Sequence, residues 1–361
     1  MAGLHHGGTE RYVVALMREA VRRGYRFDFL VWSPDNGGYS REVESMGARI
    51  FRIPSRRRPL RHAAALREFM ERHGADYDAV HMSAGSLTNI APLIYASKAG
   101  IPIRMMHIHS VSCRGLHNRL LHYLNRRRIG RYAGVLLACS EAGREWGYGA
   151  TPAYGRSLVA PNGIDVRRYS FDAESRLALR EEWGVGERYL FGIVGRLSGE
   201  KNHRFLMESF AGYRRNGGKG MLLVAGDGPE REVLEREAAR LMLGDAILFT
   251  GYRSDVDRIY SAIDTLVMPS RFEGMPTVML EARAAGLPVL VSDRVPDDGL
   301  RGGYPERLPL ERGAWERALL ESEGRGRASV PEGLEERYGI PECFDIIFGI
   351  YDESRVPEEN F

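Results

Sequence analysis

Short runs of apolar residues recur along the 361-residue chain, and polar stretches with helical spacing separate them. Within each run the apolar residues are continuous, whereas a strand with one face in water alternates apolar and polar positions. The predicted strands are residues 27–32, 78–82, 101–106 and 134–140, followed by 189–195, 220–226, 246–251, 264–270 and 288–293. Strands that are buried on both faces and alternate with helices indicate the α/β class, with parallel, doubly wound sheets.

The two series of strands predict two domains. A segment rich in Pro, Gly, Asn and Asp, "APNGIDVRRYSFDAESR" at residues 160–176, separates the series. We therefore expect an N-terminal domain over residues 1–163 and a second domain over residues 164–341. Ligands of open parallel sheets bind beyond the carboxyl ends of the strands, so functional loops should follow the strands directly.

Composition excludes several classes of function. The net charge of +3 is too small to indicate nucleic-acid binding. No apolar run approaches the roughly 20 residues of a membrane-spanning helix, and no signal-peptide core opens the chain. Three scattered cysteines indicate neither a disulfide framework nor a zinc site. We expect a cytoplasmic protein, either free or attached to the inner face of the plasma membrane.

The loop after the strand at 189–195 reads "GRLSGEKNH" and leads into a predicted helix. It carries Arg196 and Lys201, and two cations at a helix start suit a diphosphate. A solvated loop is the alternative for any isolated pair of this kind. The chain favours arginine almost everywhere, since only Lys98, Lys201 and Lys219 among its 51 basic residues are lysine. A lysine kept at 201 therefore favours a specific role for a compact ammonium group.

The loops after the next two strands are less specific. In "AGDGPERE" at 225–232, Gly226 belongs to a tight turn that opens a helix. In "FTGYRSDV" at 249–256, the backbone groups of Tyr252 and Arg253 could bind the edge of a nucleobase. Plain connecting turns explain both stretches equally well when each is taken alone.

The stretch "FEGMPTVMLEARAAGLPVLVSD" at 272–293 places two carboxylates around a helix start. Pro276 is predicted at the first helical position and Gly286 at the helix end. Gly274 lets the backbone approach a ligand closely. If the helix start holds a phosphate, Glu273 and Glu281 are free to hold sugar hydroxyls beside it. A pair of surface acids is the alternative.

Two motifs in the first half contain candidate ligand-binding residues. "HHGGTERYVVAL" at 5–16 puts Gly7 and Gly8 at a helix start, where a phosphate or sugar could lie against the amides. "MMHIHSVSCRG" at 105–115 ends a strand with His107 and His109, which face the same side. A metal pair lacks a third ligand nearby, whereas an imidazole could donate to a sugar hydroxyl or stabilise charge. One of the two could also be a core histidine.

Arginine clusters occur at residues 55–62, "SRRRPLRH", and 124–132, "LNRRRIGRY". Solvated helix faces are one explanation. The other is contact with an anionic membrane surface or with an acceptor that carries a pyrophosphate.

Taken together and in this order, the motifs "GRLSGEKN", "AGDGPERE", "FTGYRSDV" and "MPSRFEGMPTVMLEARAAGLPVLVSD" resemble family 4 of the retaining glycosyltransferases. "HHGGTER", "HIHS" and "SDRVPDDG" are similar to the subgroup that builds capsular and exopolysaccharides. The resemblance implies the GT-B fold, in which two Rossmann-like domains face a cleft. It also implies that the final helix, 342–361, packs back on the N-terminal domain.

The resemblance further implies a retaining, metal-independent transfer of a hexose. The donor would be a nucleotide-sugar, UDP-linked in the first instance, and the acceptor a saccharide or a lipid-linked saccharide. No other cofactor and no nucleic acid is implied. A nucleotide-sugar 2-epimerase, a phosphorylase and an inactive sugar-nucleotide-binding protein remain alternatives on the same fold.

The family's site residues map onto this sequence as follows. Arg196 and Lys201 would hold the donor diphosphate, Glu281 the ribose and Glu273 the transferred sugar. His109, rather than His107, would contact the sugar near its reacting carbon. The remaining donor-binding positions would be Gly7, Gly8, Asn162, Gly226, Tyr252, Arg253 and the distal-phosphate amides of Gly274, Met275, Pro276 and Thr277. The catalytic set is therefore His109, Glu273, Arg196 and Lys201.

One departure from the family concerns the N-terminal sheet. Relatives open with an apolar strand that leads into the glycine pair, whereas here only "MAGLHH" precedes Gly7. We therefore expect the N-terminal sheet to lack its first strand, through a misassigned start or a truncation.

Overall fold

The computed structural model describes residues 3–5, 7–33, 38–113, 115–296 and 306–353. The chain divides into two compact units. Unit 1 comprises Met1–Gly163 and Ile340–Phe361, and unit 2 comprises Ile164–Gly339.

Unit 2 is built on a six-stranded parallel sheet with the order β12-β11-β10-β7-β8-β9. Its strands are β7 Leu190–Val194, β8 Met221–Ala225, β9 Ile247–Gly251, β10 Thr265–Met268, β11 Val289–Ser292 and β12 Glu306–Leu308. The second series of five predicted strands is confirmed. β12 was missed, because three residues carry too little pattern to identify.

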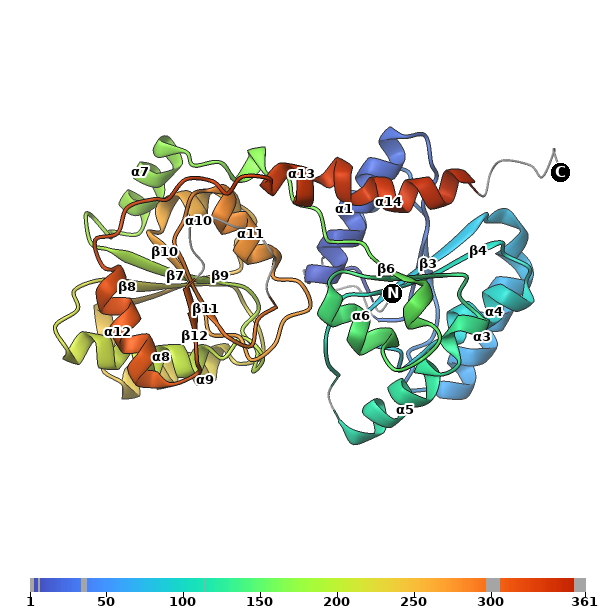
Figure 1. Cartoon of the computed structure of the whole chain (residues 1–361), viewed down its shortest axis with the longest axis horizontal. Helices are drawn as coiled ribbons and strands as arrows, with labels where there is room; N and C mark the ends of the chain where they lie inside the picture. The colour runs from blue at the N-terminus through green and yellow to red at the C-terminus, as the bar shows by residue number, and fades with distance from the viewer. Residues whose placement is uncertain (1–2, 6, 34–37, 114, 297–305, 354–361) are drawn as a thin grey trace. The chain divides into compact units, whose positions relative to one another are not determined.

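Helices cover both faces of this sheet, as Figure 1 shows. They are α7 Ala173–Glu182, α8 His203–Arg215, α9 Arg231–Arg240, α10 Val256–Ala262, α11 Thr277–Ala284, α12 Arg312–Ser322 and α13 Leu334–Tyr338. One core joins the sheet to α8, α9 and α12 around the fully buried Trp315. The other joins it to α7, α10 and α11 around Ile259 and Met279. The doubly wound prediction is thereby confirmed for this unit.

Unit 1 contains two parallel sheets, one of four strands in the order β3-β4-β5-β6 and one of two strands, β1-β2. The strands are β1 Phe29–Val31, β2 Ile50–Arg52, β3 Ala79–Ala84, β4 Ile103–Ile108, β5 Val135–Ala138 and β6 Ser157–Val159. The four predicted strands of the first series are confirmed. β2 and β6 were missed, since each has three residues and is not fully buried.

The helices of unit 1 are α1 Gly8–Arg22, α2 Ser40–Ser45, α3 Pro59–His73, α4 Ala91–Lys98, α5 Leu116–Arg126, α6 Glu141–Tyr148 and α14 Ile340–Glu353. Short 3-10 turns add Gly74–Asp76, Ile129–Arg131 and Tyr154–Arg156 here, and Arg167–Tyr169 and Gly244–Ala246 in unit 2.

The last helix, α14, packs on α1 of unit 1. Its residues Phe344, Ile347 and Phe348 are buried, and the ring of Phe344 meets Tyr12 of α1 edge-on at 5.5 Å. Because this apolar face recurs at helical spacing, the sequence predicted the helix correctly. The described part of the final helix, Ile340–Glu353, thus lies in unit 1, and residues 354–361 of the predicted range lie outside the described residues.

A gap separates β1 from β3. Within the described ranges, β1 pairs with β2 and β3 pairs with β4, and no ladder joins the two sheets. A cavity of about 980 Å³ lies there, with Phe29 and Leu30 on one side and Val80 and Met82 on the other.

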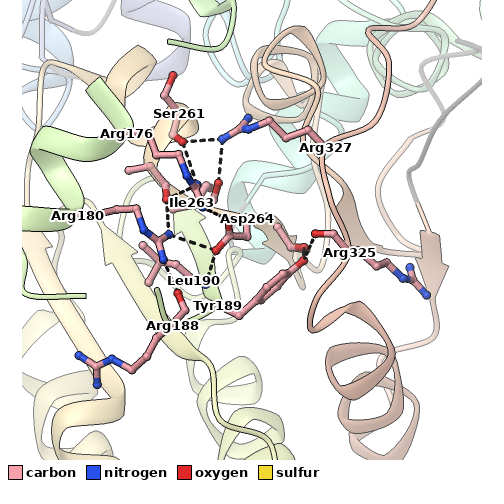
Figure 2. A network of polar contacts seen from close by, with 12 residues as sticks. Arg176, Arg180, Arg188, Tyr189, Leu190, Ser261, Ile263, Asp264, Arg325 and Arg327 are labelled. Carbon is pink, nitrogen blue, oxygen red and sulfur yellow. Dashed lines mark hydrogen bonds and ion pairs between the residues drawn. The ribbon is translucent and has the colours of Figure 1, made fainter. Parts of the chain in front are cut away.

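At the amino ends of β7 and β10, arginines surround one carboxylate (Figure 2). Asp264, just before β10, binds Arg176 at 2.7 Å and Arg180 at 3.2 Å, both from α7. Arg327 donates instead to carbonyl groups at the carboxyl end of α10, those of Ser261 and Ile263 among them. These contacts join α7, α10 and the sheet at the end opposite to the predicted functional loops.

Candidate functional site

The loops that follow β7 and β8 are in close contact, and glycines make that contact possible. A Cβ added to Gly226 would overlap the carbonyl oxygen of Gly195, and one added to Gly228 would overlap that of Leu197. Gly226 also has a φ of +144°, which side-chain-bearing residues rarely adopt. The predicted tight turn is therefore present, and its glycines allow the two loops to pack together.

Lys201 and Glu273 are brought together from the loops after β7 and β10. Lys201 Nζ lies 2.7 Å from Glu273 Oε1, and the two side chains are only 20% and 13% exposed. The lysine stem passes over Gly195, where an added Cβ would be 3.5 Å from Lys201 Cε. Two residues that the sequence singled out from segments 72 positions apart thus form one partly buried ion pair.

Asn202 fixes the mutual position of these two loops. It has left-handed backbone geometry, with φ 60° and ψ 37°, and is 7% exposed. Its amide nitrogen donates to Pro269 O at 3.2 Å, and Arg271 Nε donates to its amide oxygen at 3.3 Å. Sequence reasoning missed Asn202; the one available signal was that asparagine tolerates this conformation better than most residues.

Arg196 is exposed and follows Gly195, whose φ is +145°. Within the described part of the chain, its guanidinium makes no ion pair or side-chain hydrogen bond. In that part of the chain, Arg196, which the sequence predicted to bind a diphosphate, is therefore not paired with a protein carboxylate.

Helix α11 begins at Thr277, one residue later than predicted, and Pro276 immediately precedes it. Pro276 has no N–H, and the amide of Thr277 donates to Met275 O at 3.0 Å. A phosphate at this helix start would have to displace that bond to reach the Thr277 amide. The helix ends as expected, because Gly286 follows it with a φ of +68°.

Glu281 is buried within unit 2, at 1% exposure. Its Oε2 accepts a hydrogen bond of 2.8 Å from the hydroxyl of Tyr260 on α10. This bond fixes the orientation of one carboxylate oxygen on the inner face of α11. The sequence did not indicate Tyr260 as its partner, since no local spacing joins the two residues.

The guanidinium of Arg253 is taken up by protein carboxylates. It donates to both oxygens of Asp255, at 2.8 and 2.7 Å, and to Glu182 at 2.8 Å. These hydrogen bonds from Arg253 lower the pKa of Asp255. The side chain of Arg253 is therefore structural, while the predicted nucleobase contact concerns only its backbone. The ring of Tyr252 beside it is half exposed.

In unit 1, Gly7 and Gly8 begin helix α1 as predicted. A Cβ on Gly8 would have no neighbour within 4 Å, whereas one on Gly7 would overlap the carboxylate of Glu10. Space therefore remains over the helix start at Gly8.

His109 and Asn162 are also brought together in unit 1. His109 Nδ1 lies 3.2 Å from Asn162 Oδ1. An amide oxygen accepts only, so Nδ1 carries the proton and Nε2 is left as an acceptor. Within the described residues this buried Nε2 has no hydrogen-bond partner. Burial lowers the pKa of His109 to about 3, which keeps the ring neutral.

His107 is a core residue. Its side chain is fully buried, and its Nδ1 lies 3.3 Å from the hydroxyl of Tyr12. The rings of His107 and His109 are 4.1 Å apart, which confirms that both face the same side. A third histidine, His81 of β3, stacks on His107 and was missed, because it lies on a different strand. Among the described residues no set of three His, Cys, Asp or Glu side chains forms a metal-binding group.

The two arginine clusters lie at the start of α3 and at the end of α5. Helix α5 exposes an apolar stripe as well: Leu116, Leu120, Tyr123 and Leu124 are 84%, 59%, 44% and 49% exposed. The sequence analysis noted the arginines and missed this stripe. No helix in the described ranges combines the length and the apolarity needed to cross a bilayer.

Comparison with known families identifies the class of protein. Residues 175–297 match the family described as "Glycosyl transferases group 1", and residues 7–184 match "Glycosyl transferase 4-like domain". A protein of Bacillus subtilis (strain 168), "Putative glycosyltransferase EpsF", is 32% identical over 376 residues, covering 100% of this chain and 97% of that protein. The chain belongs to this family of glycosyltransferases.

The name of another relative states its donor. A "GDP-mannose-dependent alpha-(1-6)-phosphatidylinositol monomannoside mannosyltransferase" of Mycolicibacterium smegmatis is 27% identical, covering 84% of this chain and 79% of that protein.

Solved structures establish the fold independently. Anabaena HepE in complex with UDP and glucose superimposes with a TM-score of 0.78 at 18% identity, covering 98% of both chains. Sucrose-phosphate synthase of Thermosynechococcus elongatus gives a TM-score of 0.75 at 18% identity, covering 96% of this chain and 93% of that chain. The fold is GT-B, with two Rossmann-like domains.

Proposed function

We propose that this glycosyltransferase moves a sugar from a UDP-sugar to a saccharide or lipid-linked saccharide during capsule or exopolysaccharide synthesis. The similarity to EpsF over the whole chain supports the reaction class. Because HepE structures contain UDP or UDP-glucose, UDP-sugars are the first donors to test. GDP-mannose is the alternative, because a relative that covers most of the chain depends on it.

The observation that carries the proposal is the set of charges after β7 and β10. Arg196 is exposed, and Lys201 is held against Gly195 by Glu273. When a nucleoside diphosphate leaves, negative charge develops on its phosphate oxygens, and fixed cations stabilise it. Arginine supplies a planar fork and lysine a point charge, and together they serve as the positive end of the site.

Glu273 has two roles in this proposal. It orients the ammonium of Lys201 in the free protein, at 2.7 Å. Its second oxygen is proposed to accept hydroxyl groups of the transferred sugar. Glu281 of α11, which accepts the hydrogen bond from Tyr260 of α10, is proposed to bind the ribose hydroxyls.

In unit 1, His109 is proposed to contact the transferred sugar. Because Asn162 keeps the proton on Nδ1, Nε2 would accept a hydrogen bond from a sugar hydroxyl. This differs from the donating imidazole that the sequence alone allowed.

The reaction is proposed to be retaining and to need no divalent metal. Arg196 and Lys201 neutralise the leaving group in place of an ion. Activity that persists in EDTA would support this part of the proposal, and activity that magnesium restores after EDTA treatment would contradict it.

Attachment to an anionic membrane is proposed for the face of unit 1 that carries α5. The stripe of Leu116, Leu120 and Tyr123 with arginines at the end of the helix has the character of an interfacial helix. Such attachment would place the enzyme where lipid-linked acceptors lie.

The experiment is a donor panel with and without acceptor. The protein is incubated with UDP-sugars and GDP-mannose, and release of UDP or GDP is followed in the presence of lipid-linked acceptor extracts. Acceptor-dependent release of UDP is the expected result. Release without acceptor would indicate a 2-epimerase or hydrolysis, phosphate-dependent release a phosphorylase, and donor binding without turnover an inactive binding protein.

A further inference from the structure

The ring of His109 is held by three neighbouring side chains of unit 1. Asn162 Oδ1 lies 3.2 Å from its Nδ1, and the ring centroids of His107 and Tyr12 lie 4.1 and 4.6 Å from its own. The outer torsion of a histidine side chain is broad, so one hydrogen bond does not by itself fix the plane of the ring. The two ring contacts therefore determine where the buried Nε2 of His109 points.

Tyr12 supports this ring in two ways. Its side chain is buried, at 5% exposure, and its ring packs directly on that of His109 at an angle of 50°. Its hydroxyl lies 3.3 Å from His107 Nδ1, and the rings of Tyr12 and His107 meet edge-on at 5.2 Å. The same tyrosine therefore contacts His109 and also holds the second ring that packs against it.

Tyr12 also connects His109 to the start of α1. It lies four residues after Gly8, and residues four apart share one face of a helix. The space over Gly8 is open, and the sequence predicted that the donor binds at this helix start. Because a helix holds its residues at fixed spacing, Tyr12 relates the position of His109 Nε2 to the amides at that start.

We propose that Tyr12 is a positioning residue, which sets the direction of His109 Nε2 relative to the start of α1. This inference rests on the proposed function, in which Nε2 accepts a hydrogen bond from a hydroxyl of the transferred sugar. Tyr12 acts through His109 and takes no part in the chemistry itself. Its contribution is measurable because a misplacement of about 1 Å can lower a rate by about 10²-fold.

Two variants separate the ring of Tyr12 from its hydroxyl. Tyr12→Phe keeps the ring against His109 and removes the bond to His107, whereas Tyr12→Leu removes both. Phe344→Leu is the matched control, because Phe344 is fully buried in the same core and its ring meets Tyr12 edge-on at 5.5 Å. Within the described residues, Phe344 makes no ring contact with His107 or His109.

The first readout is the state of the His109 ring, which does not depend on activity. The full-length protein is labelled with ¹⁵N at its histidines, and the spectrum of His109→Gln assigns the ring signals. The unmodified protein should show one tautomer, with the proton on Nδ1. Tyr12→Leu should shift both ring nitrogens toward an average of the two tautomers, because the ring can then turn away from Asn162. Tyr12→Phe should shift them less, and Phe344→Leu should leave them unchanged.

The second readout is steady-state transfer from a UDP-sugar. Tyr12→Leu should lower kcat by about 10- to 100-fold and change KM for the donor by less than about twofold. Tyr12→Phe should lower kcat by about fivefold, the scale of one ordinary hydrogen bond. Phe344→Leu should keep its kcat.

The outcomes separate this inference from the proposed function. His109 signals that stay unchanged in Tyr12→Leu, or that shift equally in Phe344→Leu, would overturn the inference. If Tyr12→Leu does not fold, unchanged His109 signals together with unchanged kcat in Tyr12→Phe would overturn it. Shifted His109 signals with unchanged kcat would support the positioning by Tyr12 and contradict the role of His109 in the proposed function.

Discussion

The ammonium of Lys201 and the carboxylate of Glu273 lie 2.7 Å apart, although they come from loops after different strands. The pair is about four-fifths buried. It aligns the one lysine of the predicted site while leaving Arg196, six residues after the start of β7, exposed. The consequences of this arrangement can be measured.

Lys201→Met should lower kcat by about 10²- to 10³-fold, because the leaving phosphate loses one fixed donor. Steady-state transfer assays with the cognate donor measure this. Lys219→Met, an exposed lysine of the same unit, is the matched control and should keep its activity. Lys201→Met leaves the carboxylate of Glu273 without its ammonium partner, which could destabilise the fold. The double variant Lys201→Met/Glu273→Gln removes that unpaired charge, so its stability shows whether Lys201→Met loses activity through unfolding. Wild-type turnover in a folded Lys201→Met variant would refute the assignment.

Glu273→Gln should reduce kcat and sugar selectivity more than it reduces affinity for UDP. The amide keeps the size of the side chain but removes the charge that attracts the ammonium and accepts sugar hydroxyls. Calorimetric titration with UDP and a panel of UDP-sugars separate these effects. Glu232→Gln, an exposed acid on α9, serves as the control. Equal losses of affinity, turnover and selectivity would argue against a sugar-facing role.

Unit 1 should lose stability as the pH falls from 6.5 toward 4. Burial lowers the pKa of His81 to about 4 and that of His109 to about 3, both from 6.5. The unfolded chain then binds more protons than the folded one below pH 6.5, so the stability present above that pH is lost on acidification. At pH 5 the cost is about 2 kcal/mol for each histidine.

Amide exchange in β3 and β4 between pH 7.5 and 5, corrected for intrinsic rates, measures this loss. His81→Gln should flatten the dependence, and His117→Gln on exposed α5 should not. A profile that is flat in the unmodified protein would contradict the prediction.

Asp264→Ala should destabilise unit 2 by about 3 kcal/mol. The substitution leaves the guanidinium of Arg180, 7% exposed, and that of Arg176 without their carboxylate. Urea unfolding monitored for this unit gives the change. Asp257→Ala breaks the more exposed pair with Arg168 and should cost less than about 1 kcal/mol. Similar losses of stability in the two variants would show that burial does not determine how much an ion pair contributes to the stability of unit 2.

The protein should bind anionic vesicles through α5, and binding should weaken with salt. Leu120→Asp should reduce binding to phosphatidylglycerol vesicles, because it removes apolar contact and adds a negative charge. Leu177→Asp, on α7, is the control: Leu177 is 71% exposed against 59% for Leu120, and the variant should bind as the unmodified protein does. Binding that ignores salt, or no binding at all, would exclude attachment through this face.

Local pattern was sufficient for most of the architecture. Continuous apolar runs located nine of the strands, and the helical spacing at the end of the chain located α14. The three strands that escaped, β2, β6 and β12, are three residues long and have no pattern of their own. Their positions depend on the neighbouring strand with which they pair.

Local pattern also indicated which loops carry the candidate site residues. Loops after parallel strands converge at one edge of a sheet, so Arg196, Lys201 and Glu273 could be named from the sequence. The ion pair between Lys201 and Glu273 could not be predicted from the sequence, and neither could the role of Asn202. Those contacts join residues that are far apart in the chain. The proton position on His109 depends likewise on Asn162, 53 residues away.

By itself, the sequence determined the fold class, the family and the loops that carry charge, because periodicity and motif spacing are properties of short segments. Only the tertiary structure decided which charges are paired, which histidine nitrogen is left to accept, and that in the described residues no ladder joins β1 to β3. Those features arise where distant segments meet, and no local pattern records the distance between them.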